Sequence, residues 1–274
     1  MISWRFIDTG PLDGPANMAV DEALLACFDP ATSAPVLRLY GWHPPAFSLG
    51  RFQDAGQILD LEKCRDAGIP VVRRITGGGV IYHADELTYS IVCSPNQIPP
   101  AKSVKDSFRV LTSFLLRCYE KLGLAARYAV DLYPAGARLG GRTPLCFAGR
   151  EAYDILVQGR KIGGNAQRRL KNVIFQHGSI PLRGSLATAA GYVRDLPPGL
   201  EEGTASLADF GVTIPVPDLK HLLLEAFAAN FASAVASGEL LTGEREMTER
   251  FLHERLPGAM VPSHQEYDCR HVEQ

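Results

Sequence analysis

The sequence predicts an α+β fold in which mixed or antiparallel sheets pack against helices. Short apolar stretches of strand length recur between segments that have the 3.6-residue period of amphipathic helices. Two of the expected strands follow one another across a short hairpin turn, Gln158-Gly159. Because hairpins are mixed with packed helices, the pattern favours α+β over a doubly wound parallel sheet. With 274 residues, of which 46% are apolar, the chain can bury a sizeable core.

Each expected strand is a short apolar run bounded by glycine, proline or polar turn residues. Two of these strands are expected to pair with each other across the turn Trp42-His43-Pro44-Pro45. The strand that precedes the longest glycine run is expected to be buried. The expected strands lie at 4–8, 35–41, 46–50, 71–74, 87–93, 153–157, 160–164 and 173–182.

Each expected helix has apolar residues at i, i+3 and i+4, which form one buried stripe. No clear pattern follows residue 236, so we expect a single domain over 1–274 with a core to about 236 and a C-terminal tail at 237–274. The expected helices lie at 17–28, 61–67, 103–122 and 217–236. In the longest of them, the inward face is expected to consist of Val104, Phe108, Leu111, Phe114, Leu115 and Cys118.

Composition and charge restrict the class of protein. The formal net charge is −2, which gives no reason to expect a nucleic acid or a membrane as a partner held by bulk charge. No apolar run approaches the roughly 20 residues of a membrane span, and the first residues lack a signal-peptide pattern, so we expect a cytoplasmic protein. The six cysteines are scattered without CxxC spacing, which argues against a structural zinc site and against a disulfide framework. No metal site is expected.

A run of three glycines, Gly77, Gly78 and Gly79, follows the basic pair Arg73-Arg74. Glycine tolerates positive φ, so such a run can bring backbone N–H groups close to an anionic or thioester-like group, with the arginines supplying charge beside it. Most glycine clusters are plain turns, and this one lacks the Lys-Ser/Thr ending of a phosphate-binding P-loop. The run alone therefore indicates only a candidate ligand loop.

Three motifs together are far more specific than the glycine run. They read RRITGGGVIYH at 73–83, GRKIGGNAQRR at 159–169 and HGSIPL at 177–182. With them the chain resembles the biotin/lipoate protein ligase and lipoyl transferase family from about residue 4 to 182. Within the family it is most similar to the LipM-type octanoyltransferases, above all through Cys146-Phe147. The resemblance implies a biotin/lipoate protein ligase-like catalytic domain.

The resemblance also implies that Cys146 and Lys161 are catalytic. A cysteine thiolate can attack a thioester, and an ammonium beside the acyl carbonyl can stabilise the oxyanion that develops there. Without the resemblance, a lone cysteine is a small buried hydrophobe, as we expect for the other five, and a lysine at the start of a strand is a solvated charge. The family's K-I-x-G-x-A-Q motif is kept at 161–167 and favours the catalytic reading.

Other residues of the motifs are candidates for substrate binding. His83 either contacts substrate or has a structural role, whereas His177 is expected to support strand packing, and neither shows the partners of a Ser/His/Asp triad. Arg168 and Arg169 could meet a phosphopantetheine group or an acidic carrier domain. The candidate substrate-binding residues are Arg73, Arg74, Gly77, Gly78, Gly79, His83, Gly163, Gly164, Asn165 and Ala166.

The function implied is an octanoyltransferase without a cofactor. It would take octanoyl from acyl carrier protein onto Cys146 and pass it to a lysine of a lipoyl-domain protein, such as the glycine cleavage H protein or a 2-oxoacid dehydrogenase E2 component. An alternative is an ATP-dependent lipoate-protein ligase that forms lipoyl-AMP and needs magnesium, since the intact Gly77-Gly78-Gly79 run is typical of ligases. A third reading, a non-catalytic module that binds acyl carrier protein, is disfavoured because Cys146 and Lys161 are both present.

Overall fold

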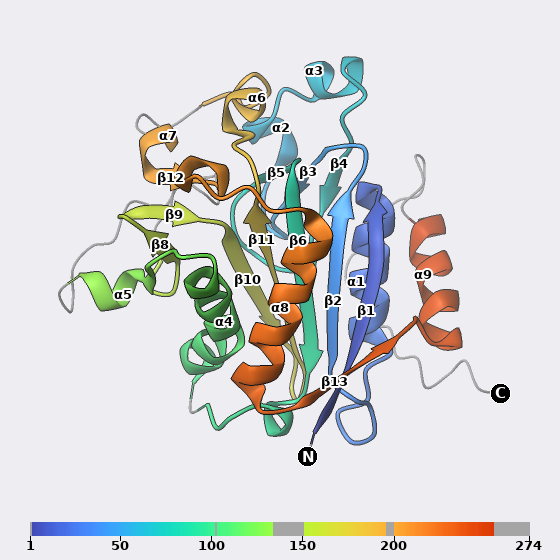
Figure 1. Cartoon of the computed structure of the whole chain (residues 1–274). Helices are drawn as coiled ribbons and strands as arrows, with labels where there is room; N and C mark the ends of the chain where they lie inside the picture. Colours follow the sequence, from blue (N-terminus) through green and yellow to red (C-terminus); the bar gives the residue numbers. More distant parts are fainter. Residues whose placement is uncertain (1, 102, 134–150, 196–199, 255–274) are drawn as a thin grey trace.

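The structure is a computed structural model that describes residues 2–101, 103–133, 151–195 and 200–254. Its centre is a six-stranded mixed sheet (Figure 1). In spatial order the strands are β10 (Gly164–Arg169), β11 (Ile174–Pro181), β6 (Glu86–Cys93), β2 (Val36–Trp42), β1 (Ser3–Leu12) and β13 (Ala234–Gly238). β1 pairs in parallel with β2 and β13, and the remaining neighbours are antiparallel. The α+β fold with mixed sheets is confirmed.

Helices cover both faces of the large sheet (Figure 1). On one face lie α4 (Val104–Lys121) and α8 (Val216–Phe231), and on the other α1 (Gly14–Ala26) and α9 (Thr242–Glu254). On the first face, the Phe227 ring meets the rings of Trp4 and Phe114 edge to face, with centroids 4.8 and 5.1 Å apart. On the second face, Leu24 of α1 packs in a buried cluster with Phe175 of β11. Burial on both faces fixes the central strands that carry the motifs.

Two smaller sheets flank the large one. The first has the order β4 (Val71–Arg73), β3 (Ala46–Leu49), β5 (Ile81–His83), and the second has the order β12 (Thr204–Ala205), β9 (Arg160–Ile162), β8 (Ile155–Val157), β7 (Ala126–Tyr128). The short helices are α2 (Ala55–Ile58), α3 (Leu61–Asp66), α5 (Ala129–Leu132), α6 (Leu186–Ala190) and α7 (Leu200–Gly203), and single 3-10 turns lie at Pro95–Gln97 and Ala208–Phe210.

Local capping explains where the two long N-terminal helices begin. α1 starts at Gly14, three residues before the predicted position, because the Asp13 carboxylate accepts a hydrogen bond from the N–H of Ala16 at 2.7 Å. α4 begins after Ser103, whose hydroxyl accepts from the N–H of Asp106 at 3.0 Å. Both helices are confirmed.

The hairpin predicted around Gln158-Gly159 is confirmed as β8 and β9. Gln158 has φ 50° and Gly159 has φ 78°, the two left-handed residues of a type I′ turn. The antiparallel register sets Lys161 opposite Leu156. This register determines which side chains of the hairpin share a face with Lys161.

The strand pair expected at 35–41 and 46–50 is wrong. Strands form at both places, but β2 belongs to the large sheet and β3 to a small one. Both edges of β2 are already occupied, by β1 and β6, so the turn after Trp42 carries the chain to the other sheet. The strand at 71–74 is not buried either, because β4 is an edge strand that pairs only with β3 among the described strands and leaves Arg73 exposed. Val104 is 54% exposed, because it lies in the first turn of α4.

The C-terminal expectations are also corrected. The helix predicted at 217–236 ends at Phe231, where Ala232 turns left-handed with φ 46°, and the following residues form β13 beside β1. The residues after 236 are not all without structure, because α9 packs Met247 and Phe251 against Ala19 and Ala23 of α1. Pairing and packing override local propensity here. In the described part of the chain, no helix has the length and apolar character of a membrane span.

Candidate active site

The three motifs converge on one narrow cavity of about 20 Å³. The glycine-loop motif contributes Arg74, Ile81 and His83 to its lining. β10 and β11, which are antiparallel neighbours, bring the second and third motifs to the same place. The other lining residues are Tyr40, Trp42, Thr88, Gly164, Asn165, Ala166, His177, Gly178 and Ser179. The structure therefore brings together residues that lie about ninety positions apart in the sequence.

Arg74 holds the glycine run from inside. Its guanidinium donates to the carbonyl of Gly79 at 2.7 Å and to that of Gly77 at 3.4 Å. Gly78 has φ 97°, and its carbonyl lies so close to Gly50 that a Cβ at position 50 would approach it to 2.0 Å. Glycine is therefore required at Gly78 for its backbone conformation and at Gly50 for the close approach.

Arg73 serves the neighbouring loop. Its Nη1 donates to the carbonyls of Gly50, Arg51 and Gln53 at 3.0, 3.1 and 2.7 Å. The N–H of Arg51 in turn donates to the carbonyl of Thr76 at 2.8 Å, which ties this loop to the glycine run. Both arginines of the basic pair thus bind backbone carbonyls around the glycine run.

His83 is buried between a hydroxyl and a carboxylate. Its Nε2 lies 2.5 Å from Oγ of Ser48, and its Nδ1 lies 2.7 Å from Oε1 of Glu86. The imidazole also stacks on the Trp42 ring, with centroids 3.8 Å apart and planes at 10°. The expectation that His83 lacks the partners of a Ser/His/acid triad is wrong, because antiparallel pairing of β3 with β5 brings Ser48 to it from 35 residues away.

Glu86 collects hydrogen bonds from three side chains. Besides His83, the hydroxyls of Thr88 and Ser179 donate to its carboxylate, each at 2.6 Å. Burial opposes the charged form most strongly, but the nearby His83 and these hydrogen bonds outweigh it and hold the pKa of Glu86 below its ordinary value. A charged carboxylate therefore lies behind the cavity lining, hydrogen-bonded to three residues that form it.

Lys161 is buried and paired, so it is not the solvated charge that its position in a hairpin suggests. Only 2% of its surface is exposed, and its Nζ lies 2.8 Å from Oδ2 of Asp154, which is 6% exposed. The same carboxylate oxygen accepts from the N–H of Glu151 at 2.7 Å. Sequence reasoning missed Asp154, although it lies diagonally across the hairpin from Lys161 and on the same face.

His177 belongs to a second buried polar cluster and does more than support strand packing. Its Nε2 lies 2.7 Å from the hydroxyl of Thr76, and its Nδ1 lies 3.8 Å from the Asp21 carboxylate. Asp21 accepts from the guanidinium of Arg38 at 2.7 Å. Burial lowers the pKa of His177, which favours the neutral imidazole. Burial alone would raise the pKa of Asp21, but Arg38 and His177 hold that pKa below the ordinary value.

The second motif shapes the cavity through its glycines. Gly163 has φ 77°, and a Cβ there would lie 2.1 Å from the carbonyl oxygen of Ser179. Asn165 accepts from the Tyr89 hydroxyl at 2.7 Å. Arg168 and Arg169 are half-buried, four and five residues further along β10 than Gly164, which is roughly 13 to 17 Å at strand spacing.

Cys146 lies outside the described residues. Three other cysteines, Cys64, Cys93 and Cys118, are buried free thiols, as expected for structural cysteines, but the same expectation is wrong for Cys27, which is half-buried and disulfide-bonded. Burial raises the pKa of Cys93 and of Cys118 to about 12, so these thiols stay protonated near neutral pH. Within the described ranges, no cluster of three or more His, Cys, Asp or Glu residues is arranged to hold a metal ion.

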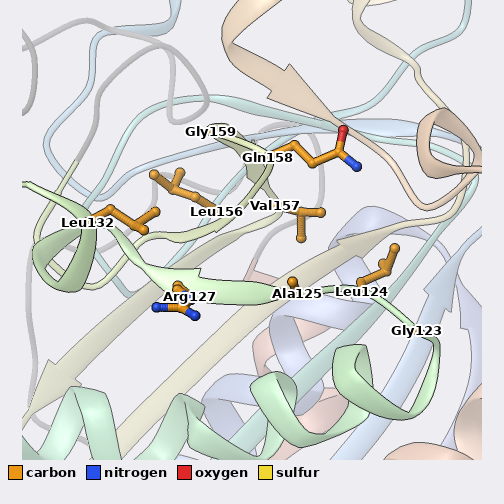
Figure 2. A pocket seen from close by; sticks show the side chains of 9 residues that line it. All are labelled: Gly123, Leu124, Ala125, Arg127, Leu132, Leu156, Val157, Gln158 and Gly159. Carbon is orange, nitrogen blue, oxygen red and sulfur yellow. The ribbon is translucent and has the colours of Figure 1, made fainter.

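A larger cavity, about 370 Å³, lies beside β7 and β8 (Figure 2). It is lined largely by apolar side chains and by the hairpin turn, and Arg127 is the one charged residue among the described residues of its lining. Among the three motifs only Gly159 contributes to it, whereas all three motifs contribute to the smaller cavity; the glycine run itself lines neither cavity. Volume alone therefore does not identify the site, and the smaller cavity is the better candidate because the motifs converge there. The residues that line the larger cavity are Gly123, Leu124, Ala125, Arg127, Leu132, Leu156, Val157, Gln158 and Gly159.

Comparison with known proteins identifies the family to which this chain belongs. The model of the lipoyl protein ligase A/B catalytic domain matches residues 13–228. Octanoyltransferase LipM of Kyrpidia tusciae is 37% identical over 266 residues, which cover 93% of this chain and 97% of that protein. Octanoyltransferase LipM of Geobacillus kaustophilus is 42% identical over 182 residues, or 65% of each chain.

Solved structures of lipoate-protein ligases share the fold. Lipoate-protein ligase A bound with ATP has a TM-score of 0.77 at 22% identity, covering 97% of this chain and 98% of its own. A bi-partite lipoate protein ligase from Thermoplasma acidophilum has a TM-score of 0.75 at 21% identity and covers 93% of each chain. At this level of identity, the two likenesses concern the fold alone.

Proposed function

We propose that this chain, which belongs to the lipoyl protein ligase A/B catalytic domain family, takes octanoyl from acyl carrier protein onto Cys146 and passes it to a lysine of a lipoyl-accepting protein. The chain is an acyltransferase, and octanoyl transfer in protein lipoylation is the activity that its relatives of 37% and 42% identity carry in their names. The thioester on Cys146, the carrier-protein donor, a cytoplasmic location and the absence of a cofactor are the further parts of the proposal.

One observation carries it: the three motifs line a single cavity beside the buried Glu86 and the glycine run. We assign substrate binding to His83, Gly164, Asn165 and Ala166, which line this cavity, and to the glycine run, which is held by Arg74 of the same lining. Gly163 admits the close approach of the strand that carries Ser179. Arg73 and Arg74 contribute by holding the loops that border the substrate.

In the first half-reaction, the thiolate of Cys146 attacks the carbonyl carbon of the octanoyl thioester. A new C–S bond forms on Cys146, and the bond to the carrier's phosphopantetheine sulfur breaks, which releases a thiol after proton uptake. While the carbonyl is tetrahedral, its oxygen carries negative charge. The ammonium of Lys161, held by Asp154 at 2.8 Å, would stabilise that charge.

In the second half-reaction, the neutral amine of the acceptor lysine attacks the acyl-enzyme. An amide bond forms, the C–S bond to Cys146 breaks, and the sulfur recovers its proton. The same oxyanion develops, so Lys161 would act in both steps, and the kinetics would be ping-pong. The acceptor we propose is a folded lipoyl domain, as in the glycine cleavage H protein or a 2-oxoacid dehydrogenase E2 component.

The test is intact-mass spectrometry after mixing the protein with octanoyl acyl carrier protein in the absence of ATP. We expect the protein to gain one octanoyl group, removable by hydroxylamine, and Cys146→Ser to abolish the gain. Cys118→Ser is the matched control, because that thiol is buried and its pKa is raised by burial to about 12. An unchanged mass together with ATP-dependent transfer of free lipoate would favour the ligase alternative, for which the intact Gly77-Gly78-Gly79 run is the supporting feature.

A further inference from the structure

A continuous chain of hydrogen bonds connects Glu86 to the glycine run. It passes from Glu86 to His83 at 2.7 Å and from His83 to the Ser48 hydroxyl at 2.5 Å. Nη1 of Arg74 reaches the same hydroxyl at 2.6 Å, and its Nη2 reaches the carbonyl of Gly79 at 2.7 Å. All four side chains are buried, with Ser48 0% exposed.

The chemistry of the groups assigns a direction to this chain. A guanidinium has only donors, so the Ser48 oxygen accepts from Arg74, and the Ser48 hydrogen is left to donate to Nε2 of His83. Because Nε2 accepts from Ser48, the ring hydrogen lies on Nδ1, which donates to the Glu86 carboxylate. The Ser48 hydroxyl and both ring nitrogens of His83 are satisfied in this one arrangement.

The same geometry could be read as a nucleophilic triad, but two observations exclude that role for Ser48. Its side chain is fully buried and is not part of the cavity lining. Its oxygen also accepts a charge-assisted hydrogen bond from Arg74, which withdraws the electron density that a nucleophile needs. Glu86 and His83 therefore orient Ser48 without making it a nucleophile that attacks substrate.

The last link of this hydrogen-bond chain, from Arg74 to the glycine run, shows that purpose. Arg74 turns the carbonyl of Gly77 toward itself, and in a trans peptide the following N–H points the opposite way. The N–H of Gly78 is therefore directed away from Arg74, on a residue that is exposed. The orientation of Arg74 thus decides which side of the glycine run offers carbonyls and which offers amides.

The ring of His83 is itself fixed from a second side. Trp42 stacks on it, and the indole N–H donates to the Thr88 hydroxyl at 2.8 Å. Thr88 then donates to the same Glu86 oxygen that His83 binds. Glu86 therefore orients both the imidazole and the ring that covers it.

We propose that Ser48, His83 and Glu86 are positioning residues that act through Arg74 to hold the glycine run with its amide groups turned toward the acyl carbonyl. The inference rests on the proposed acyl transfer, because it assigns the run a carbonyl to bind. His83 then has two roles, as part of the cavity lining and as a link in the chain that orients Arg74.

The test compares Ser48→Ala with Ser48→Thr, which keeps the hydroxyl, and with Thr112→Val, which removes an equally buried hydroxyl on α4 outside the cavity. We expect Ser48→Ala to shift the amide NMR signals of Gly77, Gly78 and Gly79 in the protein without substrate. Its kcat should fall about 10- to 100-fold, with KM within about threefold, because small misplacements act mainly on the transition state. Ser48→Thr should recover most of kcat, and Thr112→Val should match wild type.

The result that overturns the proposal is a folded Ser48→Ala variant with unchanged glycine signals and unchanged kcat. Complete loss of the octanoyl adduct with unchanged glycine signals also overturns it, since that outcome marks Ser48 as a nucleophile. Should Ser48→Ala not fold, Glu86→Gln takes its place with the same expected shifts and the same reduction of kcat. The NMR arm needs no substrate, so it remains decisive even when wild type forms no adduct and the proposed function itself fails.

Discussion

Replacement of Lys161 by methionine should reduce both stability and activity, for separable reasons. Methionine fills a similar volume but removes the ammonium that lies 2.8 Å from Asp154. The carboxylate is then left buried without its counter-charge, which costs about 3–5 kcal/mol in comparable pairs. For a chain of this size, 1 kcal/mol corresponds to roughly 2–4 °C in Tm, so we expect Tm to fall by roughly 6–20 °C.

The double variant Lys161→Met with Asp154→Asn separates the two effects. Asparagine keeps an oxygen for the N–H of Glu151, which donates at 2.7 Å, but it carries no charge that needs a partner. We therefore expect the free energy of unfolding to return to within about 1 kcal/mol of wild type. Activity should not return, because the ammonium that we propose to stabilise the oxyanion is still missing, and kcat should stay lower by on the order of 10² to 10³.

The assays are urea unfolding for the free energy and single-turnover octanoyl transfer for the chemical step. Lys121→Met is the matched control, because Lys121 pairs with Glu225 at the surface, where such pairs contribute about 1 kcal/mol or less. A Lys161→Met variant that unfolds like wild type would show that the pair is not buried in solution. A double variant with normal transfer would show that no ammonium is needed at this position.

Three further outcomes are expected. Gly163→Ala should destabilise the β10–β11 pair and reduce transfer, because its Cβ would lie 2.1 Å from the Ser179 carbonyl, whereas Gly184→Ala, with open space around it, should be neutral in thermal melts. Reversal of Arg168 and Arg169 to Glu should slow transfer to the acceptor more than formation of the acyl-enzyme. The difference between the two half-reactions should shrink as salt shortens the screening length from about 8 Å to about 3 Å. Equal losses in both half-reactions would contradict this prediction. Acidification should lower the free energy of unfolding. Burial depresses the pKa of His177 below 6.5, Arg38 and His177 depress the pKa of Asp21, and His83 depresses the pKa of Glu86. As the pH falls, the unfolded chain therefore binds protons before the folded chain does, which favours unfolding. The loss should begin below about pH 6.5 and grow below about pH 4.5 in melts across that range, and His177→Gln should remove the first stage.

The period of apolar residues and the residues typical of turns were sufficient to predict most of the helices and strands. The helix at 103–122 and the strands at 87–93 and 173–182 are confirmed within one or two residues, because each has a clear apolar pattern and a cap or turn at its ends. The failures have a common cause. β3 belongs to a different sheet from β2, and residues 234–236, predicted as the end of a helix, form part of β13 and pair with β1. In both cases the partner strands lie far away in the sequence. Local patterns do not encode which edge of a sheet is free.

In the site, too, contacts between residues close in the sequence could be predicted, whereas contacts between distant residues could not. The His83–Glu86 pair and the Asp154–Lys161 pair have separations of three and seven residues, and the hairpin around Gln158-Gly159 already sets the second pair on one face. Both pairs could have been predicted from spacing. The link from His83 to Ser48 spans 35 residues, and the one from Glu86 to Ser179 spans 93. Such links exist only once the strands are paired, which is why the polar chain behind His83 was not predicted.

The burial of charge also explains why composition was a poor guide to this site. A net charge of −2 and a charged content of 21% describe an ordinary surface, and lysine, arginine and glutamate are expected to be solvated. Here Arg74 and Lys161 are at least 97% buried, and each is held by a specific partner. Since a buried charge without a partner is strongly destabilising, the fold keeps these groups only with their partners in place. The same condition fixes their orientation, so the interactions that make these charges tolerable in the core also hold the glycine run, through Arg74, and the Lys161 ammonium in place.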